Sequence, residues 1–263
     1  MSLVLGVIPV RYGSTRFPGK PLTVLGDPFD NRTMIEEVWR RASAARGIDR
    51  LIVATDDQRI LDAATRFGAE ATMTSSEHTS GTDRVAEVAR DAGEQYSVII
   101  NIQGDEPLLT SRSQELLLGS FQGDASPEMA TLWEPFESAS EVLDPNNVKV
   151  VMDGSGKALY FSRSPIPYVR GTQSPMQSPM TLDSPAQLEH FRKHQGIYAY
   201  RRDALLNLTG MPPSPLERAE GLEQLRALEA GYRIHVVKSD FRSQSVDTPK
   251  DLERLSRLML EAE

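Results

Sequence analysis

Three basic side chains lie close together in a loop that follows the first apolar segment of the chain. The sequence GVIPVRYGSTRFPGKPL (residues 6–22) contains Arg11, Arg16 and Lys20 among glycines and prolines. Because like charges this close repel one another, a loop that keeps all three indicates a bound anion. Backbone N–H groups in a glycine-rich loop can also point at a phosphate. A phosphorylated ligand is therefore the expected anion, and solvated surface charges are the alternative.

The loop departs from the two familiar phosphate-binding patterns. Five residues separate Gly13 from Gly19 where a P-loop has four, and Pro21 occupies the position of the metal-binding Ser or Thr. The dinucleotide pattern G-x-G-x-x-G is absent from the chain. The loop therefore predicts phosphate binding of another kind.

Two aspartates stand at positions where a carboxylate could meet such a ligand. Asp105, in QGDEP, follows the apolar segment 96–103, and Asp247, in VDTP, precedes the last helical segment. Taken alone, Asp247 could cap that helix, although Thr248 could do the same, and Asp105 could form a turn before Pro107. The residues leave these alternatives open.

The first half of the chain alternates strand and helix patterns, which predicts a mostly parallel sheet with helices on both faces. Expected strands and helices follow in turn at 3–10, 33–45, 50–55, 56–68, 69–73, 80–93 and 96–103. In such a sheet ligands bind at the carboxyl ends of the strands, where the basic loop and Asp105 are both expected.

The second half is less regular and predicts one domain over residues 1–263, without a linker. The capping signals of Ser214, Pro215 and Glu217, and the stop at Gly231, predict one helix over 214–231. The Ser-Pro-rich segment 170–187 predicts a long loop. Strands are expected at 128–133, 147–153, 158–163, 195–201 and 232–239, and a closing helix at 248–262.

Composition excludes several classes of protein. The net charge of −8 argues against general nucleic-acid binding, and the absence of cysteine excludes disulfides, thiolate metal sites and cysteine nucleophiles. The N-terminal apolar run lacks the basic start of a signal peptide, and no segment has the roughly 18 apolar residues of a membrane span. We expect a soluble cytoplasmic protein.

The loop R-Y-G-S-T-R-F-P-G-K-P-L resembles the signature R-x-x-S-x-R-x-x-x-K of sugar-activating cytidylyltransferases. The segments HTSGTDRVAE, IINIQGDEPLL, NNVKVV, ALYFSRSPIPY, GIYAYRRDAL, SPLERAEGLEQLR and SQSVDTPKDLERL follow in order. Together they are similar to the 3-deoxy-manno-octulosonate (KDO) cytidylyltransferase family over nearly the whole chain. This resemblance implies an α/β nucleotide-diphospho-sugar transferase fold (GT-A-like, Rossmann-like), a homodimer, and a sugar-binding and dimerisation region at about 130–235.

The implied reaction is nucleotidyl transfer for lipopolysaccharide biosynthesis, in which CTP and KDO give CMP-KDO and pyrophosphate. The resemblance implies catalytic and Mg²⁺-binding roles for Asp105 and Asp247, with Arg11 and Lys20 on the triphosphate. No general base is identified, and activation of the sugar hydroxyl by a second Mg²⁺ is a hypothesis. Further nucleotide-binding candidates are Gly13, Ser14, Arg16, Gly81 and Arg84, and sugar-binding candidates are Gln103, Arg163, His194, Tyr198, Glu217 and Gln224.

Some of these assignments have alternatives. Arg84 could equally be a surface charge, His194 a structural histidine, and Glu217 only a helix cap. The segments 26–35 and 171–187 depart from the family pattern, and the second precedes the sugar-binding strand, so the acceptor could instead be a sialic acid or 8-amino-KDO. A glycosyltransferase, for which a D-x-D metal motif is expected, and a catalytically silent nucleotide-binding module are the other classes.

Overall fold

The computed structural model describes residues 3–13, 17–27, 29–122, 126–170, 188–239 and 241–260, with side chains as far as Leu255. Ser14, Arg16 and the predicted loop 171–187 lie outside these residues. No helix in the described part of the chain has both the length and the apolar character that crossing a membrane would require.

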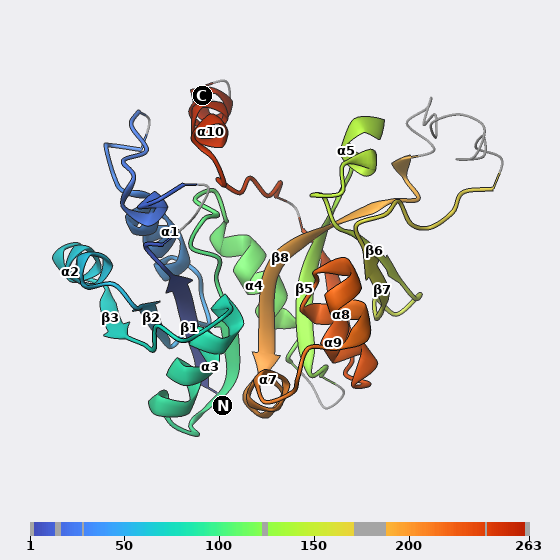
Figure 1. Ribbon diagram of the computed structural model, residues 1–263, viewed down its shortest axis with the longest axis horizontal. Helices are drawn as coiled ribbons and strands as arrows, with labels where there is room; N and C mark the ends of the chain where they lie inside the picture. Colours follow the sequence, from blue (N-terminus) through green and yellow to red (C-terminus); the bar gives the residue numbers. More distant parts are fainter. Residues whose placement is uncertain are drawn as a thin grey trace.

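One twisted sheet forms the centre of the molecule (Figure 1). Its main path runs β3-β2-β1-β4-β8-β5-β9, and all of these strands except β8 point the same way. The predicted mixed, mainly parallel sheet is thus confirmed. The main-path strands are β1 (Leu3–Val10), β2 (Arg50–Thr55), β3 (Glu70–Met73), β4 (Tyr96–Asn101), β5 (Met129–Pro135), β8 (Arg192–Arg201) and β9 (Ile234–Lys238), and β6 (Lys149–Met152) and β7 (Ala158–Ser162) form a side hairpin next to β8.

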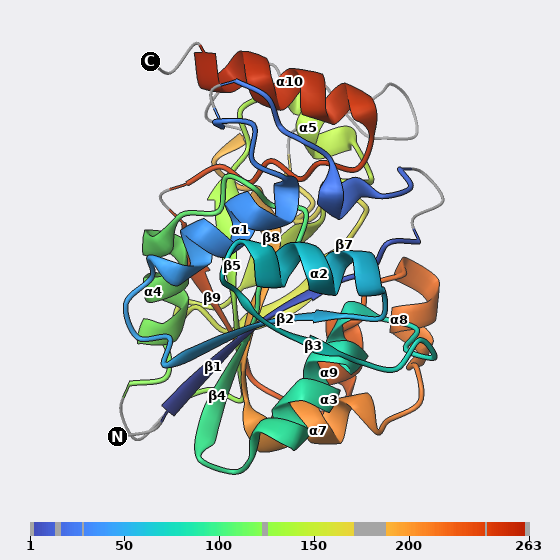
Figure 2. The ribbon, with the colours of Figure 1, turned by 90° about the vertical axis from the view of Figure 1, so that its left-hand side faces the viewer.

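Helices cover both faces of the sheet, as Figure 2 shows for α2 above the strands and α3 below them. Apolar side chains of α3 (Gly81–Ala92), α7 (Arg202–Thr209) and α9 (Gln224–Glu229) are buried with the strands on one face. Those of α1 (Met34–Ser43), α2 (Gln58–Arg66) and α4 (Ser111–Gly119) are buried on the other. Strands buried on both faces explain the continuous apolar runs of the sequence.

The last helix, α10 (Pro249–Leu260), lies apart from the two layers. Its Leu255 packs with Val246, Leu25 and Phe29 in a separate small core. A connector of residues 241–247 leads from the far side of the sheet to α10, and it has no helix or strand of its own (Figure 1). The connector places Asp247 near the carboxyl ends of β1 and β4.

The predicted helix over 214–231 is wrong in one respect, because the structure divides it into α8 (Pro215–Glu220) and α9. Gly221 adopts the left-handed conformation (φ 64°, ψ 41°) and its N–H donates to the carbonyl of Glu217, which ends α8. The capping box of Ser214 and Glu217 is present as predicted. The prediction treated Gly221 as a glycine tolerated inside a helix, whereas in the structure it ends α8.

Four other elements differ from the prediction. The helices α4, α5 (Ala139–Leu143) and α7 were not predicted, since they are short and weakly patterned. Strand β8 begins at Arg192 and not at Gln195, because residues 192–195 continue the antiparallel pairing with β5 past an irregularity at Thr131/Leu132. His194 therefore lies within a strand and not before one.

Candidate functional site

A cavity of about 310 Å³ opens at the carboxyl ends of β1 and β4, as the parallel-sheet rule predicts. Its walls come from the basic loop, the start of α3, the turn after β4 and the connector. The structure brings together seven of the residues predicted from the sequence: Arg11, Lys20, Gly81, Arg84, Gln103, Asp105 and Asp247.

Lys20 lies between the two aspartates. Its Nζ is 2.8 Å from Asp105 Oδ2 and 3.4 Å from Asp247 Oδ1. The Lys20 side chain is 14% exposed, whereas those of Asp105 and Asp247 are 31% and 40% exposed. The two acids, which are distant in sequence, thus converge on one cation at the rim of the cavity.

Other groups cap the start of α10 and close the turn after β4. The start of α10 is capped by Thr248 and Asp251, since Thr248 N–H donates to Asp251 Oδ2 at 2.7 Å and Asp251 N–H donates to Thr248 Oγ1 at 3.4 Å. The turn after β4 is closed by the backbone, with Glu106 N–H donating to the carbonyl of Gln103. Both aspartate side chains contact Lys20.

Local backbone geometry holds the basic loop in place. Gly19 has a positive φ of 72°, and its N–H donates to the carbonyl of Tyr12 at 3.1 Å. A Cβ at this position would lie 3.1 Å from the Tyr12 hydroxyl, so glycine is required. Lys20 then begins a short 3₁₀ turn (Lys20–Leu22), while Arg11 stays exposed at the end of β1. Gly13 is exposed, with nothing close to its missing side chain.

A second glycine, which the sequence did not single out, allows the turn after β4 to approach β1. A Cβ on Gly104 would overlap Val10 Cγ1 and lie 3.3 Å from the carbonyl oxygen of Pro9. No side chain fits there, so this residue sets how close Asp105 lies to the basic loop. The QGDEP motif contained this signal, because a glycine directly after a buried strand commonly marks close backbone approach.

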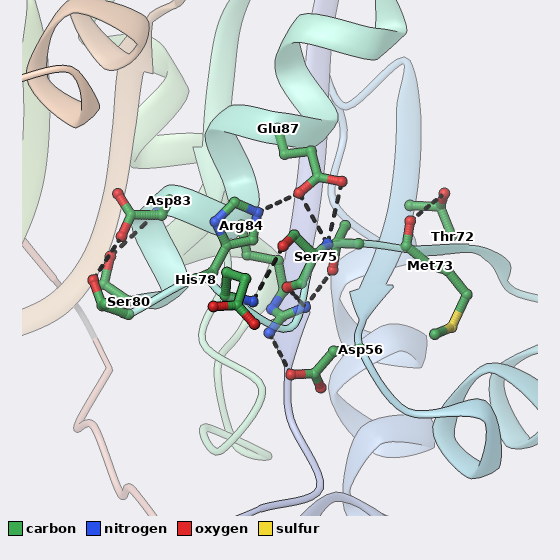
Figure 3. A network of polar contacts seen from close by, with 12 residues as sticks. Asp56, Thr72, Met73, Ser75, His78, Ser80, Asp83, Arg84 and Glu87 are labelled. Carbon is green, nitrogen blue, oxygen red and sulfur yellow. Dashed lines mark hydrogen bonds and ion pairs between the residues drawn. The ribbon is translucent and has the colours of Figure 1, made fainter.

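Arg84 is buried, so its interpretation as a surface charge is wrong. Its side chain is 4% exposed, and its Nη2 lies 2.9 Å from Asp56 Oδ2 just beyond β2 (Figure 3). The same guanidinium donates to the Thr74 hydroxyl. Arg84 thus ties α3 to the ends of β2 and β3 beneath the cavity, where it adds positive charge.

His78 lines the cavity but was not selected from the sequence. Its Nε2 contacts Glu87 on α3, as Figure 3 shows, and Glu87 also accepts the Ser75 N–H at 3.1 Å. Burial raises the pKa of Glu87, but its hydrogen bonds with His78 and Ser75 outweigh that effect and lower it. The sequence did contain a signal for this pair, because His78 and Glu87 lie on either side of SGTDR, the segment already assigned to the nucleotide.

A smaller cavity of about 50 Å³ adjoins the first, and Ser80 and Glu223 line both. Tyr198 and Gln224, two of the predicted sugar-binding residues, line this second cavity. Glu223, which the sequence analysis passed over in favour of Glu217, accepts a hydrogen bond from the Thr82 hydroxyl at 2.8 Å. The two cavities together form the candidate site.

Glu217 is occupied elsewhere and lines neither cavity. Its carboxylate accepts hydrogen bonds from both Nε and Nη2 of Arg226. It also accepts the Ser214 N–H, which caps α8. The hydrogen bonds from Arg226 hold the pKa of Glu217 below its ordinary value. The alternative interpretation of Glu217 as a structural residue therefore accounts for all of its contacts.

Arg163 also makes internal contacts and lines neither cavity. Its guanidinium donates to three carbonyls, those of Glu220, Gly221 and Pro145, at 2.7–3.3 Å. Below it the buried Lys149 Nζ donates to the carbonyl of Arg163 itself at 2.6 Å. The predicted role of Arg163 in binding a carboxylate stays a prediction.

His194 packs between aromatic rings inside the sheet. Its ring centroid is 5.0 Å from that of Phe161 and 5.4 Å from that of Tyr198, and its Nε2 is 2.9 Å from the Tyr198 hydroxyl and 3.0 Å from Thr131 Oγ1. Burial lowers the pKa of His194 to about 3 and raises that of Tyr198. His194 is therefore neutral in the folded protein at physiological pH, and it supports Tyr198 from behind the second cavity.

The pKa of His194 predicts a loss of stability in mild acid. The unfolded chain binds a proton to this histidine below about pH 6.5 whereas the folded protein does not, so the free energy of unfolding falls as the pH falls toward 3. From pH 7.5 to pH 5 we expect a loss of about 2 kcal/mol from this residue. Urea unfolding of the intact protein and of His194→Gln at both pH values measures this change in the free energy of unfolding. An equal loss in the variant would contradict the prediction.

The donor chemistry of Asp105 and Asp247 fits a hard divalent cation. Both carboxylates point their oxygens at the same place, where the ammonium of Lys20 now lies. Within the described residues no three side chains of His, Cys, Asp or Glu cluster to form a complete metal site. An ion held here would need further oxygen ligands.

Comparison with known proteins agrees with this geometry. Residues 5–234 match the cytidylyltransferase family. The chain is 48% identical to the 3-deoxy-manno-octulosonate cytidylyltransferase of Solibacter usitatus (97% of this chain, 94% of the relative) and 49% identical to that of Syntrophotalea carbinolica (96% of each). The solved structure of a CMP:2-keto-3-deoxy-manno-octonic acid synthetase complexed with CTP is similar over 100% of both chains, with a TM-score of 0.85 and 41% identity.

Proposed function

This chain belongs to the 3-deoxy-manno-octulosonate cytidylyltransferase family, and from that premise we propose how its site joins CTP to the sugar acid KDO. The protein is a nucleotidyltransferase that forms CMP-KDO and pyrophosphate. The single observation of this structure that supports the assignment of the site is the convergence of Lys20, Asp105 and Asp247. The proposed setting is a homodimer in the cytoplasm, acting in lipopolysaccharide biosynthesis.

The first cavity is the proposed CTP site. Arg11 and Lys20 offset the negative charge of the triphosphate and of the departing pyrophosphate, because cations fixed beforehand need no reorganisation during the reaction. Gly81, at the start of α3, lines this cavity, so the N-terminus of the helix adjoins the proposed ligand. Arg84, neutralised in part by Asp56, is proposed to sit beside the cytosine.

The second cavity is the proposed sugar site. Tyr198 and Gln224 offer a hydroxyl and an amide, and Glu223 offers a carboxylate between the two cavities. Gln103 lines the first cavity, two residues before Asp105, and is a further candidate for contact with the sugar. Placing the sugar there puts its anomeric hydroxyl near the α-phosphate, and attack on phosphorus breaks the bond to pyrophosphate while the hydroxyl proton passes to solvent.

Asp105 and Asp247 are the proposed Mg²⁺ ligands, with Lys20 between them in the protein alone. A Mg²⁺ ion in this position supplies charge neutralisation to the phosphates and polarises the phosphorus. Asp105 and Asp247 would hold the ion, and Lys20 would then offer its ammonium to the phosphate oxygens. The glycosyltransferase alternative is disfavoured because Gln103 occupies the first position where D-x-D is expected.

A panel of acceptors tests the proposed substrate. We expect pyrophosphate release with CTP and KDO in the presence of Mg²⁺, at a kcat/KM at least about tenfold above that with sialic acid or 8-amino-KDO, because a site built for one set of hydroxyls rejects another. Mass spectrometry of the product identifies the CMP-sugar. Faster turnover with another sugar acid would show that this acid, and not KDO, is the substrate. No turnover with any of the acceptors would overturn the proposed function.

A further inference from the structure

The connector (residues 241–247) has no regular secondary structure, so the position of Asp247 depends on hydrogen bonds to other parts of the chain. At its two ends, Phe241 N–H donates to Ser239 Oγ and Asp247 N–H donates to Asp251 Oδ2, both at 3.1 Å. Between them, the carbonyl of Phe241, the N–H of Ser243 and the N–H of Val246 are also bound. The contacts of the Phe241 carbonyl and of the Ser243 N–H lead to one buried carboxylate, that of Glu134.

Glu134 lies on β5 with its side chain only 1% exposed. Its Oε2 accepts hydrogen bonds from the Ser243 N–H at 2.8 Å and from Gln195 Nε2 at 2.6 Å. Gln195 Nε2 also donates to the carbonyl of Phe241 at 2.7 Å. Lys193 Nζ lies 2.9 Å from Oε1 and compensates the buried charge. A glutamate in the sheet thus joins two points of the connector.

The far end of the connector is joined to the turn that carries Asp105. Val246 N–H donates to the carbonyl of Asp105 at 3.0 Å, and the Ser243 hydroxyl donates to Glu106 Oε1 at 2.6 Å. Ser243 therefore links Glu134, through its N–H, with the residue after Asp105, through its hydroxyl. Ser243 thus stands in the chain of contacts between the sheet and the segments that carry the two aspartates.

We propose that Glu134 is a positioning residue, which holds the connector so that Asp247 faces Asp105 across Lys20. The inference rests on the proposed function, in which these two aspartates bind Mg²⁺ together. Glu134 touches neither substrate nor metal in this scheme, and lines neither cavity. Its effect passes through the backbone of Ser243, four residues before Asp247.

The charge of Glu134, and not only its size, is required by this arrangement. All three neighbouring groups are donors: the ammonium of Lys193, the amide of Gln195 and the N–H of Ser243. The carboxylate accepts from Gln195 and Ser243 through Oε2 and forms an ion pair with Lys193 through Oε1. The amide in Glu134→Gln must instead point its NH₂ either at the connector or at Lys193. Either orientation places donor against donor in a buried site, which is costly.

The first test compares Glu134→Gln with the intact protein by two readouts. Hydrogen exchange of the protein alone, without nucleotide or metal, is expected to accelerate at least about tenfold in peptides covering 241–247 and to stay unchanged in β1 and β4. In activity assays the Mg²⁺ concentration for half-maximal rate is expected to rise about tenfold, with the KM for KDO nearly unchanged. Unchanged exchange in the connector, or an unchanged Mg²⁺ requirement, would overturn the proposal.

A double substitution separates positioning from a general loss of stability. In Glu134→Gln with Lys193→Gln, the new side chain at 193 accepts the NH₂ of the one at 134, whose oxygen then accepts from Ser243 and Gln195. We expect the double variant to recover connector exchange and Mg²⁺ response to within about threefold of the intact protein. A double variant no better than Glu134→Gln would count against the proposal.

Two further variants complete the experiment. Glu128→Gln removes a carboxylate just before the start of β5, where it pairs with Arg233, and should leave both readouts unchanged. If Glu134→Gln does not fold, Gln195→Met removes the donor to Phe241 while retaining Glu134, and should accelerate exchange in the connector; no acceleration there would refute the role of this network. Because exchange is measured without substrates, it tests the connector even if the protein made no CMP-KDO.

Discussion

Asp105→Asn is expected to reduce kcat by about 10³-fold while leaving the protein folded. The substitution keeps the shape of the side chain but removes one of the two negative charges that face Lys20. An amide oxygen is a weaker ligand for Mg²⁺, and loss of one charged group that acts in the transition state costs factors of this size. The measurement is pyrophosphate release with CTP and KDO at saturating substrate and millimolar Mg²⁺.

The folded state of this variant is checked separately. The Asp105 side chain is about a third exposed, so its replacement should shift Tm by only about 1–3 °C. Asp49→Asn is the matched control, because Asp49 lies before β2 at the other end of the strands and its carboxylate accepts only the Val4 N–H among the described contacts. Turnover near that of the control at ordinary Mg²⁺ concentrations would remove Asp105 from the site.

Lys20→Met is expected to have two opposite effects on ligands. Turnover should fall about 10²-fold and the KM for CTP should rise, because the triphosphate loses a cation fixed at the rim of the cavity. Affinity for Mn²⁺ in the absence of nucleotide should instead rise, since the ammonium no longer competes for Asp105 and Asp247. The second effect follows only from the position of Lys20 between these carboxylates.

Two binding measurements check this prediction. Mn²⁺ titration followed by electron spin resonance, first without and then with CTP, gives the metal affinity in each state, and steady-state kinetics give the KM for CTP. Lys157→Met, which removes an exposed lysine from the turn between β6 and β7, is the control for loss of charge alone. Weaker metal binding in Lys20→Met without nucleotide would show that the ammonium does not occupy the cation position.

Much of the fold follows from local patterns. The strands β1, β2 and β4 are predicted because burial on both faces requires continuous apolar runs, and α8 begins at Pro215 because its capping box is encoded within four residues. The split at Gly221 was missed because a left-handed glycine and a tolerated helical glycine look alike in sequence. Short helices such as α5 depend on tertiary packing more than on pattern.

The residues of the candidate site also fall into those that local patterns predict and those that only the folded structure identifies. The basic loop and Asp105 could be assigned from sequence because each directly follows a strand whose carboxyl end is predictable. Glu217 was selected over Glu223 from the sequence, in which both occur in one helical pattern, whereas the structure places Glu223 at the cavities. Only the packing of Arg226 on Glu217, and the opening of Glu223 toward the cavities, separates them.

The sequence by itself determined the family, the nucleotidyl-transfer chemistry and seven of the residues that line the first cavity, because these are set by short motifs in a fixed order. The tertiary structure decided which charges meet. The distance from Lys20 to Asp105 and Asp247, the burial of Arg84 against Asp56 and the attachment of the connector to Glu134 each join segments far apart in the chain. Such contacts depend on the closure of the sheet and the route of the connector, which local residue patterns do not specify.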